Sequence, residues 1–177
     1  MFQSFEQVAN PRDGAARLAA LRGALAAAGH DGCIVPRADV YQGEYVAEAD
    51  ARLKWLTGFT GSAGFCIVLP GIAGVFIDGR YRTQVKAEVD LSAFTPVPWP
   101  ETRPAEWLAE HLPTGGRIAY DPWLHTAREI GEMAERLTGS GIELVAAPNP
   151  VDPLWPDRPA PPRAPATIQP IEFAGET

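Results

Sequence analysis

Two short apolar runs near the middle of the chain constrain the fold more than any other feature. Phe65–Leu69 and Val75–Ile77 are continuously hydrophobic, which is typical of strands buried on both faces. The segment between them contains the turn pair Pro70-Gly71, and a connection this short joins antiparallel neighbours. The sequence therefore predicts an antiparallel hairpin, and a larger sheet built around it must be mixed.

Further apolar runs alternate with amphipathic segments along most of the chain. Strands are predicted at Gly32–Pro36, Phe94–Val97, Arg117–Tyr120 and Ile142–Ala146. Prolines in and after the second of these runs confine it to an edge or an irregular segment. Strands that alternate with helices are typical of α/β folds, so we expect a mixed, mostly central β-sheet flanked by helices.

Helices are predicted from apolar residues at helical spacing and from residues that begin or end a helix. The predicted helices are one capped by Asp13 that runs to about Ala28 and buries Leu18, Leu21 and Leu25; one with Leu53 and Leu56; one capped by Asp78 with Tyr81, Val85 and Val89 on one face; one opened by Thr102 that runs to about Leu112; and one with a Thr126–Glu129 capping box and the buried stripe Ile130, Met133, Ala134 and Leu137.

The charge balance excludes some classes of partner. The net charge is −7 and the sequence pI is about 4.9, which argues against nucleic acid and gives no reason to expect an anionic membrane. The first 13 residues lack the apolar core of a signal peptide, and no stretch is long enough to span a bilayer. Cys33 and Cys66 lie in apolar runs, so we expect reduced thiols and a cytoplasmic location.

From residue 148 onward the composition changes. Many of the 18 prolines crowd into this segment, which can form neither a helix nor a central strand. We therefore expect an α/β domain over residues 1–147 and an extended tail over 148–177 that leads toward a missing second domain. Trp155 is expected to pack against the first domain, and Ile171–Thr177 to fray or to begin a missing element. The run at 159–165 also fits a ligand for a proline-binding module, which we consider the weaker interpretation.

The residues after the second run of the hairpin include two arginines in an unusual place. Arg80 and Arg82 fall in the first turn after Asp78, where the positive end of a helix disfavours cations. One interpretation is that both extend into water or pair with Asp78. The other is that this strand end presents a guanidinium to an anion or a carbonyl oxygen, a task that suits its planar set of donors.

No self-sufficient active site is visible in the sequence. His30, His111 and His125 lack the spacing of a metal pair, and the glycine-rich turn Gly58–Gly64 is not a phosphate loop because it precedes a strand. We expect that turn to be structural. The Tyr41–Tyr45 segment reads as a loop whose tyrosines either anchor a partner or simply cover the loop.

Four motifs together resemble a known family. They are YQGEY at Tyr41–Tyr45, WLTGFTGSAG at Trp55–Gly64, IDGRY at Ile77–Tyr81 and NPVDPLWPDRP at Asn149–Pro159. In this order they resemble the N-terminal domain of three-domain Xaa-Pro aminopeptidases (aminopeptidase P), of the creatinase N-terminal superfamily. The resemblance implies a mixed sheet with a topology distantly like that of ribonuclease H, followed by a domain of similar fold.

The resemblance also implies a function that this chain does not carry alone. A pita-bread catalytic domain, absent here, would hold two Mn²⁺ ions on two Asp, one His and two Glu ligands, so this chain is expected to have no catalytic residue, metal ligand or peptidase activity. In that family Arg80 would contact a peptide substrate with proline at its second position, and Asp78 and Tyr81 would orient it. A homodimer of the full enzyme is also implied. The alternative is a peptide- or protein-binding module, as in catalytically dead relatives that serve in histone chaperones.

Overall fold

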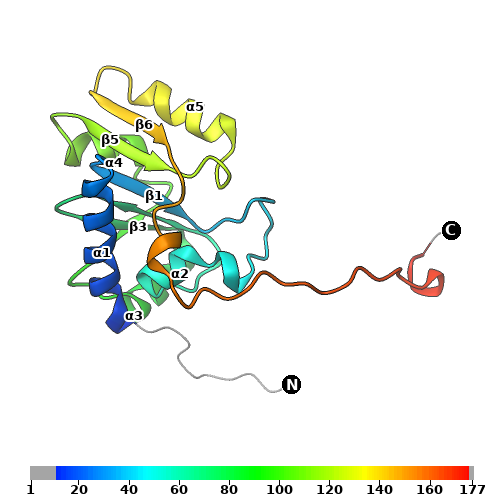
Figure 1. Cartoon of the computed structure of the whole chain (residues 1–177). Coiled ribbons are helices and arrows are strands. Elements are labelled where there is room, and N and C mark those ends of the chain that lie inside the picture. The colour runs from blue at the N-terminus through cyan, green and yellow to red at the C-terminus, as the bar shows by residue number, and fades with distance from the viewer. Residues whose placement is uncertain (1–10, 176–177) are drawn as a thin grey trace.

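A single mixed sheet organises the computed structural model, which describes residues 11–175 (Figure 1). Within these residues the sheet has six strands in the order β4-β3-β2-β1-β5-β6. The strands are β1 (Gly32–Pro36), β2 (Phe65–Val68), β3 (Ala73–Ile77), β4 (Thr95–Pro98), β5 (Gly116–Tyr120) and β6 (Ile142–Ala146). The predicted mixed sheet is therefore confirmed, and the proline-rich β4 lies at an edge, as its composition requires.

The predicted antiparallel hairpin is also confirmed, and it lies inside the sheet. β2 pairs antiparallel with β3, where Cys66 lies opposite Val75, and antiparallel with β1 on its other side. The remaining pairs, β3–β4, β1–β5 and β5–β6, are parallel. Of the strands that the structure describes, β2 alone therefore runs in the opposite direction. The loops that follow the other strands consequently gather at one edge of the sheet, together with the turn that enters β2.

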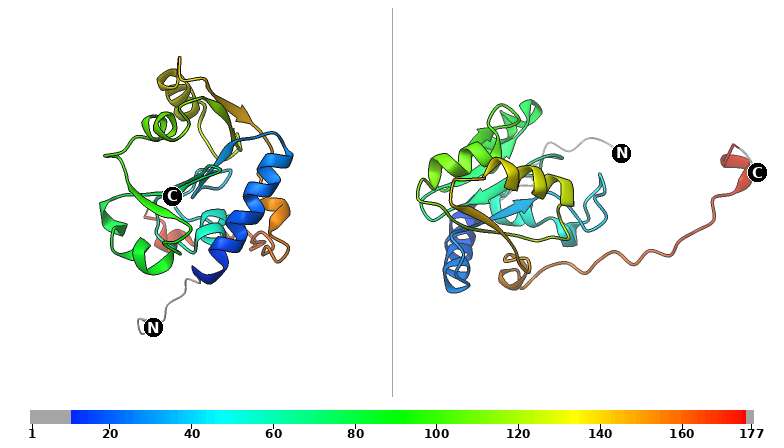
Figure 2. Two further views of the ribbon diagram at one scale, coloured as in Figure 1. Left: turned by 90° about the vertical axis from the view of Figure 1, so that its left-hand side faces the viewer. Right: turned by 90° about the horizontal axis from the view of Figure 1, so that it is seen from above.

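Helices cover both faces of this sheet (Figures 1 and 2). They are α1 (Gly14–Ala27), α2 (Arg52–Thr57), α3 (Gln84–Glu88), α4 (Pro104–His111) and α5 (Ala127–Arg136). The first three contribute to one core cluster, for example through Leu21 and Leu56, and α4 contributes Trp107 and Leu108 to a second cluster. Because alternate strand residues point to opposite faces, Cys33 joins the first cluster and Ile34 the second.

Two predicted helix starts are wrong. Asp13 makes no side-chain cap to α1, because a short 3-10 turn, Pro11–Asp13, already leads into the helix; its carboxylate instead accepts a hydrogen bond from Arg17 at 3.1 Å. α4 is preceded by Arg103 and not by Thr102, although proline does occupy its first turn as expected.

Two other helices differ from their predicted form. The helix expected after Asp78 is divided into a 3-10 turn, Gly79–Tyr81, and the short α3. The capping box of α5 is confirmed, since Glu129 N donates to Thr126 Oγ1 at 3.2 Å and Thr126 N donates to the Glu129 carboxylate at 2.8 Å. The prediction of a buried stripe on this helix is wrong except for Leu137. No residue of α5 itself is fully buried, and Leu137, which is buried, lies just beyond the helix. The helix packs beside β6, an edge strand that is itself partly exposed, so the sheet covers its apolar face incompletely.

The start of the proline-rich tail packs on the domain and the rest does not. Trp155 is buried and stacks on Trp55 with ring centroids 5.6 Å apart, which confirms its predicted packing. From Pro159 the described chain is exposed, and it runs away from the domain to a 3-10 turn at Ile171–Phe173 (Figure 2). The division at residues 147 and 148 stays a prediction.

Two remaining sequence expectations concern the thiols and the membrane. Cys33 and Cys66 are free and buried, and burial raises the pKa of Cys33 to about 12. No helix within residues 11–175 has the length and apolarity to cross a bilayer. The expectation about a signal peptide falls largely on residues 1–10, outside the described part of the chain.

Two glycines allow a matched test of the fold. A Cβ on Gly32 would lie 2.4 Å from the carbonyl oxygen of Val68 in the neighbouring strand, whereas a Cβ on Gly23, exposed on α1, meets no atom within 4 Å. We expect Gly32→Ala to lower the free energy of unfolding by about 1–3 kcal/mol, and Gly23→Ala to raise it by roughly 0.5–1 kcal/mol. Urea unfolding followed by circular dichroism measures both, and equal effects would contradict the described pairing of β1 with β2.

Candidate functional site

The edge where the strand ends gather carries the residues singled out in the sequence. Strand β3 ends at Ile77, and Asp78 then adopts an extended conformation as the cap of the turn Gly79–Tyr81. Asp78 Oδ1 accepts the main-chain hydrogen bond of Arg80 at 2.9 Å. The predicted capping role of Asp78 is therefore confirmed, and it fixes the backbone from which Arg80 projects.

Arg80 is both paired with Asp78 and exposed, so the first interpretation is confirmed, and presentation of its guanidinium to a ligand stays a prediction. Its Nη2 donates to Asp78 Oδ2 at 2.6 Å, and its Nε lies 3.1 Å from both carboxylate oxygens. Its side chain is nevertheless 64% exposed, and Nη1 has no partner within residues 11–175. Hydrogen bonds from Arg80 lower the pKa of Asp78, so the carboxylate stays ionised and holds the guanidinium by one side only. Arg82 instead pairs with Glu101 at the surface.

The aromatic ring of Tyr81 packs against the guanidinium of Arg80. The Arg80 guanidinium lies 5.1 Å from the centre of the Tyr81 ring, and that ring packs edge-on against Phe59 at 5.5 Å. The Tyr81 hydroxyl contacts Ser62 Oγ at 2.5 Å. This hydrogen bond, together with the charge of Arg80, lowers the pKa of Tyr81. Ser62 was not predicted to have this role, because nothing in the sequence places it beside Tyr81.

The glycine-rich turn that carries Ser62 is held rigidly, as its predicted structural role requires. The Thr60 amide and hydroxyl donate to the Glu88 carboxylate at 2.8 and 2.6 Å, which ties the turn to α3. Gly58 has φ +84°, and a Cβ on Gly61 would lie 2.2 Å from the Phe59 ring. The role of Glu88 was missed in the sequence, since an acidic residue on a helix gives no sign of a partner 28 residues earlier.

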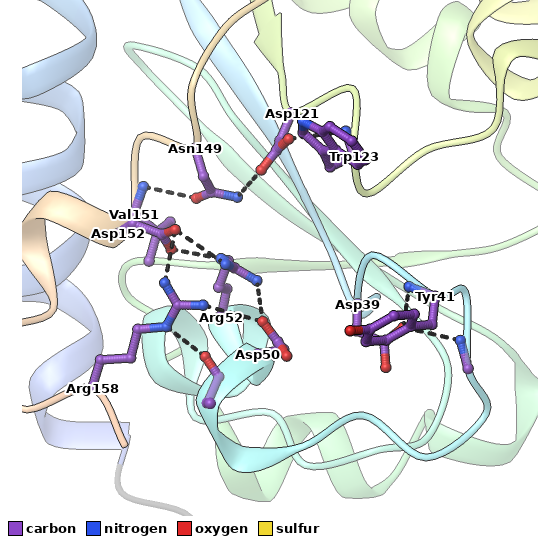
Figure 3. A network of polar contacts seen from close by, with 12 residues as sticks. Asp39, Tyr41, Asp50, Arg52, Asp121, Trp123, Asn149, Val151, Asp152 and Arg158 are labelled. Carbon is purple, nitrogen blue, oxygen red and sulfur yellow. Dashed lines mark hydrogen bonds and ion pairs between the residues drawn. The ribbon is translucent and has the colours of Figure 1, made fainter. Parts of the chain in front are cut away.

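The loop after β1 presents aromatic side chains at the same edge. Asp39 is buried, and its Oδ1 accepts the amide hydrogen bonds of Tyr41 and Gly43 at 2.9 and 3.1 Å (Figure 3). Tyr41 and Tyr45 are 86% and 88% exposed. The predicted loop is confirmed and its start is rigid, whereas the role of the two tyrosines as partner anchors stays a prediction.

A similar arrangement follows β5. Asp121 is buried, its Oδ1 accepts the amide hydrogen bond of Trp123 at 3.0 Å, and Trp123 is largely exposed (Figure 3). The other oxygen, Oδ2, accepts from Asn149 at 3.2 Å. Asn149, the first residue of the fourth motif, therefore ties the start of the tail to the end of β5.

A groove of about 430 Å³ opens between the loop after β1, α4 and α5. Its apolar lining includes Phe65, Trp99 and Met133, and His125 lies on its wall. Burial lowers the pKa of His125, which favours the neutral imidazole. Within residues 11–175 no group of three or more His, Cys, Asp or Glu side chains that could hold a metal ion is found.

A second polar cluster, which the sequence did not predict, joins α2 to the tail (Figure 3). Arg52 is only 5% exposed, and its guanidinium donates to both oxygens of Asp152 at 2.6 and 3.1 Å and to Asp50 at 3.1 Å. Arg158 pairs with Asp50 at 3.1 Å and with Asp152 at 2.8 Å, and it donates to the Ala49 carbonyl at 2.6 Å. Burial opposes the charge of Arg52, but the hydrogen bonds and charges of Asp152 and Asp50 raise its pKa.

Comparisons with known proteins agree with the fold. The sequence profile of the Creatinase/Prolidase N-terminal domain matches residues 17–154. A protein of Coccidioides posadasii described as a probable Xaa-Pro aminopeptidase P is 39% identical over 171 residues, which cover 94% of this chain and 26% of that protein. The chain thus spans about a quarter of the length of the curated relatives that it matches.

Solved structures show the same relationship. An X-prolyl aminopeptidase from Caenorhabditis elegans, described as a cytosolic enzyme with a di-nuclear active site, aligns with a TM-score of 0.75 at 32% identity; the alignment covers 82% of this chain and 26% of that one. The N-terminal domain of the cytoplasmic peptidase PepQ from Mycobacterium tuberculosis aligns with a TM-score of 0.60 at 25% identity, covering 78% of this chain and 98% of that one.

The hydrogen bond between Ser62 and Tyr81 can be tested by titration. A hydroxyl that donates to the phenolate stabilises the ionised form, so Ser62→Ala should raise the pKa of Tyr81 toward its usual value. Nuclear magnetic resonance titration of tyrosine labelled at Cζ measures this shift. Ser92→Ala is a matched control, because Ser92 donates to Asp90 instead. An unchanged Tyr81 pKa in Ser62→Ala would show that the described contact does not exist in solution.

Proposed function

The chain belongs to the creatinase/prolidase N-terminal domain family, and from this premise we propose that it is the non-catalytic N-terminal domain of an Xaa-Pro aminopeptidase. Such an enzyme removes the N-terminal residue of a peptide whose second residue is proline. The names of its relatives and their roughly fourfold greater length support this assignment. The following domains would belong to the same polypeptide, and the catalytic one would carry the chemistry.

We assign substrate contact to Arg80, with Asp78 and Tyr81 as the residues that orient it. The observation that carries this proposal is the one-sided pairing of the Arg80 guanidinium, which leaves Nη1 without a partner among the described residues on a side chain that is 64% exposed. A guanidinium in this state can donate to a peptide carbonyl oxygen or to a carboxylate. The cost of ordering the side chain is met in advance by Asp78 and by the Tyr81 ring, so little further ordering accompanies binding.

The metal ions of the enzyme would lie outside this chain. We propose that two Mn²⁺ ions are held in the catalytic domain, where they would lower the pKa of a bound water and so supply the hydroxide. The related di-nuclear enzyme of C. elegans supports two metal ions but does not name the metal. That enzyme and the PepQ domain are described as cytosolic and cytoplasmic, which supports a cytoplasmic location here. A homodimer of the full enzyme remains part of the proposal.

A second candidate function is a module that binds a peptide or a protein without any peptidase activity. The exposed aromatic side chains Tyr41, Tyr45 and Trp123 favour it, because aromatic residues are enriched where proteins bind one another. The polypeptide that continues from this chain distinguishes the two candidates. A pita-bread domain with intact Asp, Asp, His, Glu and Glu ligands supports the peptidase, and degraded ligands support the binding module.

Substitution of Arg80 tests the proposed substrate contact. In the full-length enzyme, Arg80→Ala should reduce kcat/KM for Xaa-Pro peptides by about tenfold to a hundredfold, the usual range for one charge-assisted hydrogen bond to substrate. Arg82→Ala is the matched control, because the Arg82 side chain is also largely exposed but pairs with Glu101. Unchanged kinetics in Arg80→Ala, with thermal unfolding of the protein also unchanged, would remove Arg80 from the site.

The division of labour between domains has its own test. The isolated 177-residue chain, supplied with Mn²⁺, should not hydrolyse Xaa-Pro peptides, because its described residues bring together no set of metal ligands. The full-length enzyme under the same conditions is the positive control. Peptidase activity that copurifies with the isolated chain and is abolished by a chelator would overturn the assignment of catalysis to another domain.

A further inference from the structure

The proline-rich tail contacts the domain as far as Arg158 and is exposed from Pro159 onward. Val151 and Trp155 are buried, and Arg158 is held by Asp50 and Asp152. Residues 159–175 are exposed throughout, and their described hydrogen bonds lie within the turn around Ile171–Phe173. The composition is rich in proline on both sides of this point, so proline content does not explain the difference. Specific contacts do.

The charged contacts of this segment link four side chains, Asp50, Arg52, Asp152 and Arg158, to one another. Arg52 uses Nε, Nη1 and Nη2 on Asp152 and Asp50, and Arg158 uses the same two carboxylates and a main-chain oxygen. Two arginines therefore balance two aspartates in a partly buried site. Each member has two partners of opposite charge, so removing one arginine would leave two partly buried carboxylates sharing a single cation, which costs more than an exposed ion pair contributes. The set is consequently expected to form or to break as a unit.

An aromatic contact also holds the same segment of the tail on α2. The Trp155 ring stacks on Trp55 with an interplanar angle of 23°, and the Arg17 guanidinium lies 4.6 Å from the centre of the Trp55 ring. Trp55 and Arg52 both belong to α2. This short helix thus binds the tail through a charged residue and an aromatic residue one turn apart, and it leads at its C-terminus into the glycine-rich turn that carries Ser62.

We propose that Asp50, Arg52, Asp152 and Arg158, together with the Trp55–Trp155 stack, form a latch that fixes residues 151–158 on the domain. The flexible joint to the rest of the polypeptide then begins at Pro159 and not at residue 148. Release of the latch would free eight more residues, which adds about 25 Å of reach to an extended proline-rich segment. The latch therefore sets the distance between this domain and whatever follows it.

The latch also connects the start of the tail to the edge of the sheet that carries Arg80. Arg52 and Ser62 are separated by one turn of helix and the rigid glycine-rich turn, so the origin of the tail and the support of Arg80 belong to one continuous rigid segment. If the proposed function is correct, the latch holds Arg80 at a defined place relative to the catalytic domain. The latch itself does not depend on that function, and it is tested without an activity assay.

The ¹H–¹⁵N heteronuclear Overhauser effect of the 177-residue chain locates the joint directly, since it reports backbone motion on the picosecond to nanosecond scale. In the unsubstituted protein we expect values for Asn149, Val151, Trp155 and Arg158 that equal those of β5, and a fall to low values from Ala160 onward. Low values already at Asn149 and Val151 would overturn the latch, whatever any variant does.

Substitution then tests which contacts hold the segment. Arg158→Ala should lower the Overhauser values of residues 151–158 to those of the exposed tail, and should abolish the exciton band that the stacked Trp55–Trp155 pair gives in circular dichroism. Values for β5 should not change. Arg163→Ala, also in the tail but exposed, is the matched control and should leave both signals unchanged.

Two further results decide the outcome. If Arg158→Ala leaves both the Overhauser values and the exciton band intact, the charged set does not hold the tail and the proposal is wrong. Asp152→Asn provides a second route to the same loss, because it removes one charge of the set while keeping the size of the side chain, and it should reproduce the effect of Arg158→Ala. Different responses of the two variants would contradict a latch that opens as a unit.

Discussion

The insertion of one reversed strand between parallel neighbours determines where everything else in this domain lies. Because β2 pairs antiparallel with both β1 and β3 while the outer strands follow their neighbours in parallel, the strands on either side of β2 end at the same edge. The turn that enters β2 lies at that edge as well. As a result, Tyr41, Ser62, Arg80 and Trp123, which come from four separate segments, are carried by connections on one side of the sheet.

The features that could be predicted from the sequence depend on short stretches of chain. The hairpin follows from two apolar runs and a turn, the Asp78 cap from its position after a strand, and the capping box from residues three apart. The failures come from packing between elements. Asp13 has the residue type of a cap but belongs to a 3-10 turn that leads into α1, and the stripe of α5 has the right spacing but only an edge strand beside it.

The same distinction applies to the candidate site. Arg80 and Asp78 are two residues apart, so their pairing was one of the alternatives open from the sequence. Ser62 meets Tyr81 across 19 residues and Arg52 meets Asp152 across 100, and a single sequence offers no signal that pairs residues at such separations. The fourth motif was therefore useful as a mark of family resemblance, while its physical role became visible only when the tail was seen beside α2.

Two arginines that share the same chemistry are put to opposite uses, and burial decides between them. Arg52 is withdrawn from water, and each of its three guanidinium nitrogens already donates to a carboxylate. Arg80 is engaged by Asp78 through Nε and Nη2, and its side chain is largely exposed, so a ligand can bind Nη1 without displacing a partner among the described residues. A buried charge that lacks a partner destabilises the fold, whereas an exposed charge stays hydrated until a ligand replaces the water. The exposed arginine is therefore suited to reversible contact, and the buried one to holding two distant segments of the chain together.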